Sequence, residues 1–558
     1  MASVASRRPR GLSRLSASPP KGNSWVALLV LGLVLVSLVL RTLSLGDSLW
    51  MDEGLSIGIS SQPFLDIPTV LRQDGSPPLY YMLLNLWTSV IGSGPGETQG
   101  LSVVISLLLI PAALWAGWTL FDRRAGLIAA ALAAVNPFVT TYAQETRMYS
   151  LMVLLSLIVT AAFVHVFVFR RRQYLPLLAV SLAALLYTHN WGMFVASGLV
   201  VALAFLWRTS DGAQAGRPGR SAGRALVGRA PDRSVSGEHR SPVFLSDERR
   251  DLLRDAAIGF GAAALLYLPW LPTLLYQVRH TGAPWLDAPR LGAPVQIAKS
   301  LLGGGASTVA LVLAAGSGLA LALRERLSRE RSALFTMGIV FVGTLAVAWL
   351  VSQVSPAWTT RYLGATLGAL LLLASVGLAR AGNLGLVALA IVLGVWAVPK
   401  SYELKNKSNA ADLGKTATPQ LRSGDLVVVM QPEQTPLIDY HLPVGGLRYA
   451  TPLGPVRNPS VMDWTDAQSR LVAATPRRNL DPQLASLPRG AKVFFVHPVT
   501  TQQNDWDAPW TQLVRRRSAQ WGLKMGLDPR FRQLQAAPDF YRRATRIGVR
   551  GVLYEKRS

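Results

Sequence analysis

The sequence predicts an all-α protein that crosses a membrane many times and carries a smaller α/β domain at its C-terminal end. Three observations predict this fold. Half of the 558 residues are hydrophobic and only 16% are charged, against roughly 25% in an ordinary soluble domain. Apolar runs of membrane-helix length recur along the first 400 residues. Beyond them the chain turns polar, with short β-rich runs at 425–430 and 491–496, which indicates a separate domain over 401–558.

The chain has a large excess of positive charge, with 56 Lys and Arg against 31 Asp and Glu and a net charge of +25. A soluble nucleic-acid-binding protein would spread this excess over a charge-rich surface. The low charged fraction excludes that class, so we expect no nucleic-acid partner. The absence of cysteine also excludes disulfides, thiolate metal sites and a cysteine nucleophile.

The apolar runs predict about eleven membrane helices within 25–400. A hydrocarbon core about 30 Å thick needs about 20 apolar residues per helix. Runs of this kind are centred near residues 33, 110, 131, 159, 181, 199, 266, 315, 342, 371 and 391. The basic arm 1–24 resembles the start of a signal peptide, but no small-residue cleavage site follows Leu40. We therefore expect an uncleaved first helix with a cytoplasmic N-terminus.

Arginine-rich loops predict the orientation of the bundle, because positively charged loops stay on the cytoplasmic side. The clusters all fall on one side only if 77–90 does not cross the membrane. That stretch is short, rich in Tyr and Trp, and opens with two prolines, which is typical of a helix at the outer interface. The basic clusters lie at 123–124, 170–172, 208–254 and 324–331.

This orientation assigns each remaining segment to a side. The segment 44–100 becomes one long external loop, and the Gly-, Ser- and Arg-rich segment 208–255 becomes a disordered cytoplasmic loop. Eleven crossings place 401–558 outside, where we find no catalytic pattern. The Ala-, Leu-, Gly- and Arg-rich composition points to a bacterial plasma membrane.

Polar side chains gather at the external ends of the predicted helices, where an ionised group near hydrocarbon is costly without a partner. Each group has an ordinary alternative role, such as a helix cap, a local ion pair between Glu145 and Arg147, a structural histidine or an interfacial anchor. Their shared side favours a common site instead. Trp285 and Asp287 are external too but follow no spacing pattern. The candidate site residues are Asp52, Glu53, Asp74, Gln144, Glu145, Arg147, Tyr149, His189, Arg361 and Tyr362.

These residue types match one kind of chemistry. Arginine holds phosphate through paired hydrogen bonds, and a carboxylate beside it can act as a general base, a contribution of about 10²- to 10⁴-fold. A second acid is not needed when the leaving group is a phosphate, because a cation stabilises its growing charge. The set predicts sugar transfer from a polyprenyl phosphate.

Five motifs carry a resemblance to a known family: WMDE at 50–53, DGSPPLYY at 74–81, YAQETRMYS at 142–150, YTHNW at 187–191 and RYL at 361–363. In this order they resemble the membrane-embedded GT-C glycosyltransferases of family 39, the protein mannosyltransferase and aminoarabinose transferase-like group. The resemblance implies that Asp52 is the catalytic base, with adjacent Glu53 as the other candidate. It also implies that Glu145 and Arg147 lie by the active site and that Arg361 contacts the lipid phosphate.

We therefore expect an inverting glycosyltransferase that moves mannose, or a pentose such as arabinose, from a polyprenyl-phosphate donor to an extracytoplasmic hydroxyl. The acceptor is a glycan, lipid or protein. Many relatives have His where this chain has Ser76, which weakens the case for a metal ligand or phosphate contact there. A related transferase of the superfamily uses a divalent ion in the equivalent loop region, so a divalent cation stays an open possibility, and no other cofactor is expected. The alternative function is a transporter or flippase of lipid-linked glycans, which would show internal repeats and polar residues near the midplane.

Overall fold

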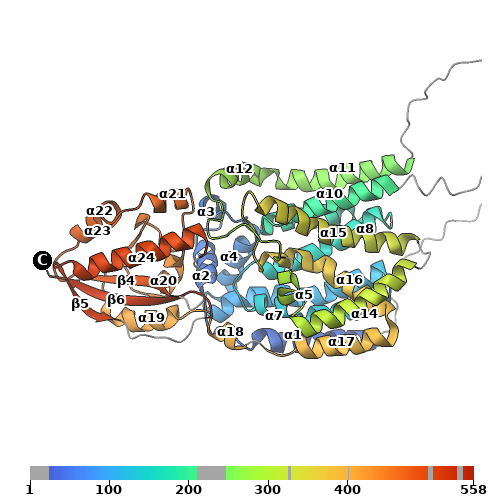
Figure 1. Ribbon diagram of the computed structural model, residues 1–558, viewed down its shortest axis with the longest axis horizontal. Coiled ribbons are helices and arrows are strands. Elements are labelled where there is room, and N and C mark those ends of the chain that lie inside the picture. The colour runs from blue at the N-terminus through green and yellow to red at the C-terminus, as the bar shows by residue number, and fades with distance from the viewer. Residues whose placement is uncertain are drawn as a thin grey trace, which may run out of the picture.

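The computed structural model describes residues 24–209, 247–293, 295–324, 328–399, 401–499, 507–536 and 545–557. Residues 1–23 of the predicted basic arm 1–24 and most of the predicted cytoplasmic loop 208–255 lie outside these residues. The described chain forms a long helical bundle with a sheet domain attached to one end (Figure 1). The expected combination of a polytopic helical domain and a C-terminal α/β domain is therefore confirmed.

The bundle is built from long apolar helices. Nine described segments are long and apolar enough to cross a membrane, and the bent pair α6 and α7, which meet at 47°, makes up to ten. The helices of the bundle are α1 (Ser24–Thr42), α5 (Pro95–Leu120), α6 (Arg123–Val135), α7 (Pro137–Ala143), α8 (Tyr149–Phe167), α9 (Leu175–Thr188), α10 (Gly192–Thr209), α11 (Asp247–Tyr267), α12 (Leu271–His280), α13 (Val295–Ser300), α14 (Gly305–Arg324), α15 (Ser328–Ser352), α16 (Leu367–Arg380) and α17 (Gly382–Trp396).

The predicted count of eleven full-length spans is wrong at one helix, because α9 has only 14 residues. It nevertheless returns the chain along the whole of α8. The Tyr174 ring, just before α9, stacks on His165 near the end of α8 at 4.1 Å between ring centroids. His189, just after α9, lies 6.1 Å from Tyr149 at the start of α8. The alternation of sides on which the predicted orientation rests is thus kept.

Close helix contacts in the bundle depend on small residues. A Cβ atom on Gly117 of α5 would lie 2.8 Å from the Gly126 Cα of α6. A Cβ atom on Gly318 of α14 would lie 1.8 Å from the Gly377 carbonyl oxygen of α16. Apolar helices in a membrane gain little from the hydrophobic effect and associate through such close backbone packing.

Three short helices connect α1 to α5 at the end of the bundle that meets the sheet domain (Figure 1). They are α2 (Met51–Ser60), α3 (Ile67–Asp74) and α4 (Leu79–Ile91). With 13 residues, α4 is too short to cross a membrane. It buries Tyr80, Tyr81 and Leu84 and exposes Leu86 and Val90; its location at the outer membrane interface stays a prediction.

The C-terminal domain holds a six-stranded sheet in the order β3-β2-β1-β4-β6-β5. Strand β1 pairs in parallel with both β2 and β4, and the other pairs are antiparallel. The strands are β1 (Leu426–Val429), β2 (Arg448–Thr451), β3 (Gly454–Val456), β4 (Lys492–Val499), β5 (Phe531–Ala536) and β6 (Gly548–Lys556). The chain leaves β1 for β2 on one side and reaches β4 on the other, so the carboxyl end of β1 is a topological switch point.

Helices cover both faces of this sheet. Leu426 and Val428 face a core that includes α24, whereas Val427 and Val429 face a core that includes α19 and α20, as alternation along a strand requires. The helices are α18 (Ser401–Lys405), α19 (Ala410–Ala417), α20 (Thr435–His441), α21 (Ala467–Val472), α22 (Pro476–Asn479), α23 (Asp481–Ala485) and α24 (Pro509–Leu527).

Helix α2 joins the bundle to the sheet domain. A Cβ atom on Gly54 would lie 2.7 Å from the Leu437 Cα of α20, and one on Gly58 would lie 1.8 Å from the Ser460 carbonyl oxygen. Leu55 belongs to the core on one face of the sheet and Ile57 to the core on the other. The helix that carries Asp52 and Glu53 is therefore held rigidly between the two domains.

Candidate active site

A cavity of about 560 Å³ lies where the bundle meets the sheet domain. Its wall combines the segment around α2 and α3, the turn before α8, the loop after α12, the turn before α16 and parts of the sheet domain. Five of the ten predicted site residues do not line it: Glu53, Gln144, Glu145, Tyr149 and His189. The predicted residues that line the cavity are Asp52, Asp74, Arg147, Arg361 and Tyr362.

Asp52 and two arginines form the centre of this wall. Asp52 lies in the first turn of α2, is 6% exposed, and places Oδ2 3.0 Å from Nη1 of Arg361. Arg147 Nη1 donates to the Asp52 carbonyl oxygen at 3.2 Å and to Ser56 Oγ at 3.0 Å. The Asp52 carboxylate and the guanidinium groups of Arg361 and Arg147 thus meet in one cavity.

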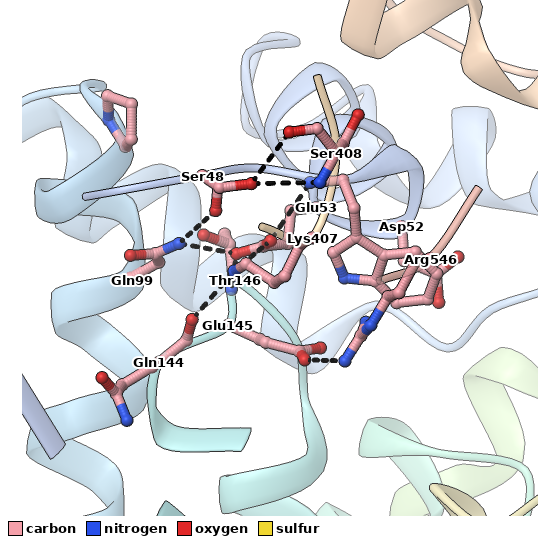
Figure 2. Close-up of polar contacts among 12 residues, drawn as sticks. Ser48, Asp52, Glu53, Gln99, Gln144, Glu145, Thr146, Lys407, Ser408 and Arg546 are labelled. Atoms are coloured by element: carbon pink, nitrogen blue, oxygen red, sulfur yellow. Dashed lines mark hydrogen bonds and ion pairs between the residues drawn. The ribbon is translucent and has the colours of Figure 1, made fainter. Parts of the chain in front are cut away.

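Glu53, the neighbour of Asp52, is fully buried and does not line the cavity; Figure 2 shows its contacts with the surrounding polar side chains. Its carboxylate is 2.6 Å from Lys407 Nζ. Burial raises the pKa of Glu53, and the ammonium of Lys407 opposes that rise. The remaining donors are Gln99 Nε2 at 2.9 Å, the Thr146 backbone at 2.9 Å and the Trp50 backbone at 3.3 Å. Three of these four donors, Lys407, Gln99 and Thr146, lie in other segments of the chain, so Glu53 joins these segments to α2.

Gln144 and Glu145 also hold segments together. Gln144 Oε1 accepts from the Ser44 backbone at 2.9 Å, and its carbonyl oxygen accepts from Lys407 Nζ at 3.1 Å. Glu145 is fully buried and forms an ion pair with Arg546. The local Glu145–Arg147 pair considered from the sequence does not form, because Arg147 turns to α2 instead.

Tyr149, His189 and Tyr362 form an aromatic cluster behind the arginines. The His189 ring lies 4.5 Å from the Tyr362 ring and 6.1 Å from the Tyr149 ring. Burial, and then the charges of Arg147 and Arg361, lower the pKa of His189 to about 3. His189 is therefore neutral near pH 7, and its Nδ1 accepts from the Trp191 backbone at 3.1 Å. Tyr362 lines the cavity, and the rings of Tyr149 and His189 pack against it from behind.

Asp74 ends α3 and reaches the cavity beside Ser76. Burial raises the pKa of Asp74, and hydrogen bonds from Ser76 oppose this rise. Gly75, between the two, has a φ of +97°, a left-handed conformation that favours glycine. The turn points both side chains toward the same space.

Sequence reasoning missed the contribution of the sheet domain. Arg546 lines the cavity and lies 3.9 Å from the centroid of the Trp50 ring. Glu433, which follows β1 at the switch point, also lines the cavity. Glu53 and Lys407 are 354 residues apart in the chain, and Glu145 and Arg546 are 401 apart. No local spacing signals such pairs, although a buried Glu without a nearby cation implies that one exists elsewhere.

Within the described ranges, no three His, Asp or Glu side chains converge to hold a metal ion. Three of the four carboxylates that line the cavity have separate partners. Asp52 faces Arg361, Asp74 faces Ser76, and Glu433 accepts from Trp510. This donor set does not fit a divalent cation, and no step below uses one.

No protein-family model and no curated protein matches this sequence. Solved structures match its fold. ArnT from Cupriavidus metallidurans in the apo state aligns over 95% of this chain and 98% of that chain, with a TM-score of 0.55 and 14% identity. The same protein bound to undecaprenyl phosphate gives a TM-score of 0.55 at 13% identity over the same shares.

A second match is the Archaeoglobus fulgidus oligosaccharyltransferase in the apo form. It aligns over 88% of this chain and 72% of that chain, with a TM-score of 0.52 and 12% identity. Both matching proteins have the GT-C fold. The finer assignment to family 39 stays a prediction. The chain is a multi-pass membrane protein with the fold of the GT-C glycosyltransferases.

Proposed function

We propose that this protein is an inverting GT-C glycosyltransferase that uses a polyprenyl-phosphate sugar. The observation that carries the proposal is the Asp52 carboxylate, 3.0 Å from Arg361, in a cavity that also holds Arg147. The likeness to ArnT bound to undecaprenyl phosphate supports a polyprenyl phosphate as the lipid carrier. The sugar is mannose or a pentose such as arabinose, by the sequence resemblance.

Asp52 is the general base in this proposal. It takes the proton from the acceptor hydroxyl as that oxygen attacks the anomeric carbon, and the bond from that carbon to the phosphate oxygen breaks. The released polyprenyl phosphate keeps the bonding electrons. Glu53 cannot serve this role, because four donors surround its carboxylate and it does not reach the cavity.

Arg361 and Arg147 hold the donor phosphate. Arg361 Nε is buried and has no hydrogen-bond partner among the described residues, and a buried donor without a partner costs free energy. A phosphate oxygen would satisfy it. As the bond to the sugar breaks, the phosphate gains negative charge. The two fixed guanidinium groups therefore stabilise the transition state more strongly than the bound substrate.

The proposed reaction takes place on the extracytoplasmic side. The basic clusters that favour a cytoplasmic location lie at the far end of the bundle from the cavity: Arg170 pairs there with Glu248, and Arg124 donates to the Gly382 carbonyl oxygen. By the positive-inside rule, this arrangement supports an external location for the cavity and the sheet domain. The acceptor is an extracytoplasmic glycan, lipid or protein hydroxyl.

Purified protein in nanodiscs, supplied with polyprenyl-phosphate mannose or a polyprenyl-phosphate pentose and cell-envelope acceptors, tests the proposal. We expect Asp52→Asn to lower transfer about 10²- to 10⁴-fold. Asp47→Asn is the matched control, because Asp47 is partly exposed and lies 3.6 Å from Lys405 outside the cavity. Undiminished transfer by folded Asp52→Asn protein would refute the assignment. Lipid-linked sugar that crosses the bilayer without transfer would favour the flippase alternative.

A further inference from the structure

The cavity has a second wall that the proposed chemistry at Asp52 does not use. It consists of Trp285 and Asp287, from the loop after α12, and Glu433, from the turn after β1. We call these three residues the outer wall. Glu433 belongs to the sheet domain, and the loop that carries Trp285 and Asp287 contacts this domain through the Trp285 and Trp464 rings.

Trp285 presents a partly exposed indole on a rigid support. Its ring lies 4.4 Å from the Trp464 ring, which lies 5.1 Å from the fully buried Trp510 ring. The loop itself is fastened to the sheet domain, because the Trp510 backbone donates to the Pro284 carbonyl oxygen at 3.3 Å. The flat apolar face of Trp285 is therefore held in place beside the cavity.

Glu433 supplies a preorganised hydrogen-bond acceptor next to this face. Its Oε1 accepts from Trp510 Nε1 at 3.0 Å and from Gln431 Nε2 at 2.8 Å. Its Oε2 is buried and has no hydrogen-bond partner in the part of the chain that the structure describes. Glu433 also sits at the carboxyl end of β1, the switch point at which open α/β sheets bind ligands.

A carbohydrate ring matches this combination. Its C–H face packs on an aromatic ring, whose amphipathic character suits partly polar ligands. Its hydroxyls donate to carboxylates, which are acceptors only. A phosphate or a phospholipid headgroup does not match, because Asp287 and Glu433 would repel it. A peptide acceptor would not use two carboxylates to bind a neutral serine or threonine.

We propose that the outer wall binds the acceptor and that the acceptor is a saccharide. Its ring lies on Trp285, with its hydroxyls toward Glu433 and Asp287. This inference rests on the proposed transferase function and narrows it, because it selects a glycan among the possible acceptors. Glu433, Asp287 and Trp285 would be binding residues only and would not exchange a proton with the reacting atoms.

Binding of a probe saccharide to the full-length protein in nanodiscs tests the inference without turnover. The probes are short-chain alkyl glycosides of a hexose and of a pentose, detected by saturation-transfer NMR in the Asp52→Asn background. We expect ring-proton signals that persist with Trp285→Phe and disappear with Trp285→Leu. Trp25→Leu is the matched control, because Trp25 is half exposed at the start of α1. Equal signals in the Trp285→Leu and Trp25→Leu proteins would overturn the inference.

Transfer kinetics separate the acceptor from the donor sugar. We expect Glu433→Gln to raise the KM for a saccharide acceptor about 10- to 100-fold, the usual effect of losing a hydrogen bond to a charged group, with little change in the KM for the lipid donor. Glu555→Gln, in β6, is the control. A rise in the donor KM instead would overturn the acceptor assignment. Loss of transfer with Asp52→Asn is a separate result that bears on the proposed function alone.

Discussion

Replacing Lys407 by methionine should destabilise the junction between the two domains strongly. Lys407 and Glu53 are 1% and 0% exposed, and their charged atoms lie 2.6 Å apart. Methionine would leave a fully buried carboxylate with only the neutral donors of Gln99, Thr146 and Trp50. Breaking a buried pair in this way typically costs about 3–5 kcal/mol, and we expect a loss of that size in the free energy of unfolding.

Equilibrium unfolding in bicelles, followed by tryptophan fluorescence, measures this loss. Lys405→Met is the matched control. Lys405 is 51% exposed and lies 3.6 Å from Asp47, so its removal should cost no more than about 1 kcal/mol. The double variant Glu53→Gln/Lys407→Met should recover most of the stability, because no buried charge remains. Equal losses for Lys407→Met and Lys405→Met would refute the structural role of the pair.

Three further predictions concern the site. Arg361→Lys should raise the KM for the lipid donor about tenfold or more in steady-state transfer, because lysine cannot reproduce paired guanidinium hydrogen bonds; an unchanged donor KM would rule out phosphate binding by Arg361. Arg546→Gln should leave the buried Glu145 carboxylate without its partner and lower the unfolding free energy by about 3–5 kcal/mol, whereas Arg532→Gln, which affects a surface pair, should change little. His189→Asn should reduce the loss of melting temperature that occurs on acidification. The pKa of His189 is lowered to about 3 in the folded protein, against an ordinary value of 6.5. Between about pH 6.5 and 3 only the unfolded state binds the proton, so the stability of the wild type decreases as the pH is lowered through this window. The same acid sensitivity in both proteins would contradict the neutral His189.

Most of the fold could be predicted because membrane helices have a strong local signal. An apolar run of about 20 residues is recognisable by itself, and positive loops fix its direction. The prediction of a full-length membrane helix was wrong at α9. There, a 14-residue helix preceded by a short turn runs back along α8. Packing along α8, which composition does not reveal, decides the path of this segment.

The site was predictable only in part, because contacts between residues far apart in the chain leave no local signal. Asp52, Arg147 and Arg361 stood out as charged groups at helix ends, and the structure brings them together. The different roles of Asp52 and Glu53 could not be told apart, since adjacent carboxylates look alike until α2 is placed between the two domains. Lys407 and Arg546 lie in the polar C-terminal part of the chain, which contains many other cations. Their pairing with Glu53 and Glu145 could therefore not be predicted from the sequence.

Asp52 is proposed to be the general base for sugar transfer from a polyprenyl phosphate. Mass spectrometry of polyprenyl-phosphate lipids tests it most directly, in cells that lack this protein and in the same cells supplied with the wild type, Asp52→Asn or Asp47→Asn. We expect a lipid-linked sugar to accumulate in cells without the protein, to be cleared by the wild type and Asp47→Asn, and to persist with Asp52→Asn. An unchanged lipid profile in cells without the protein, or full clearance by Asp52→Asn, would contradict it.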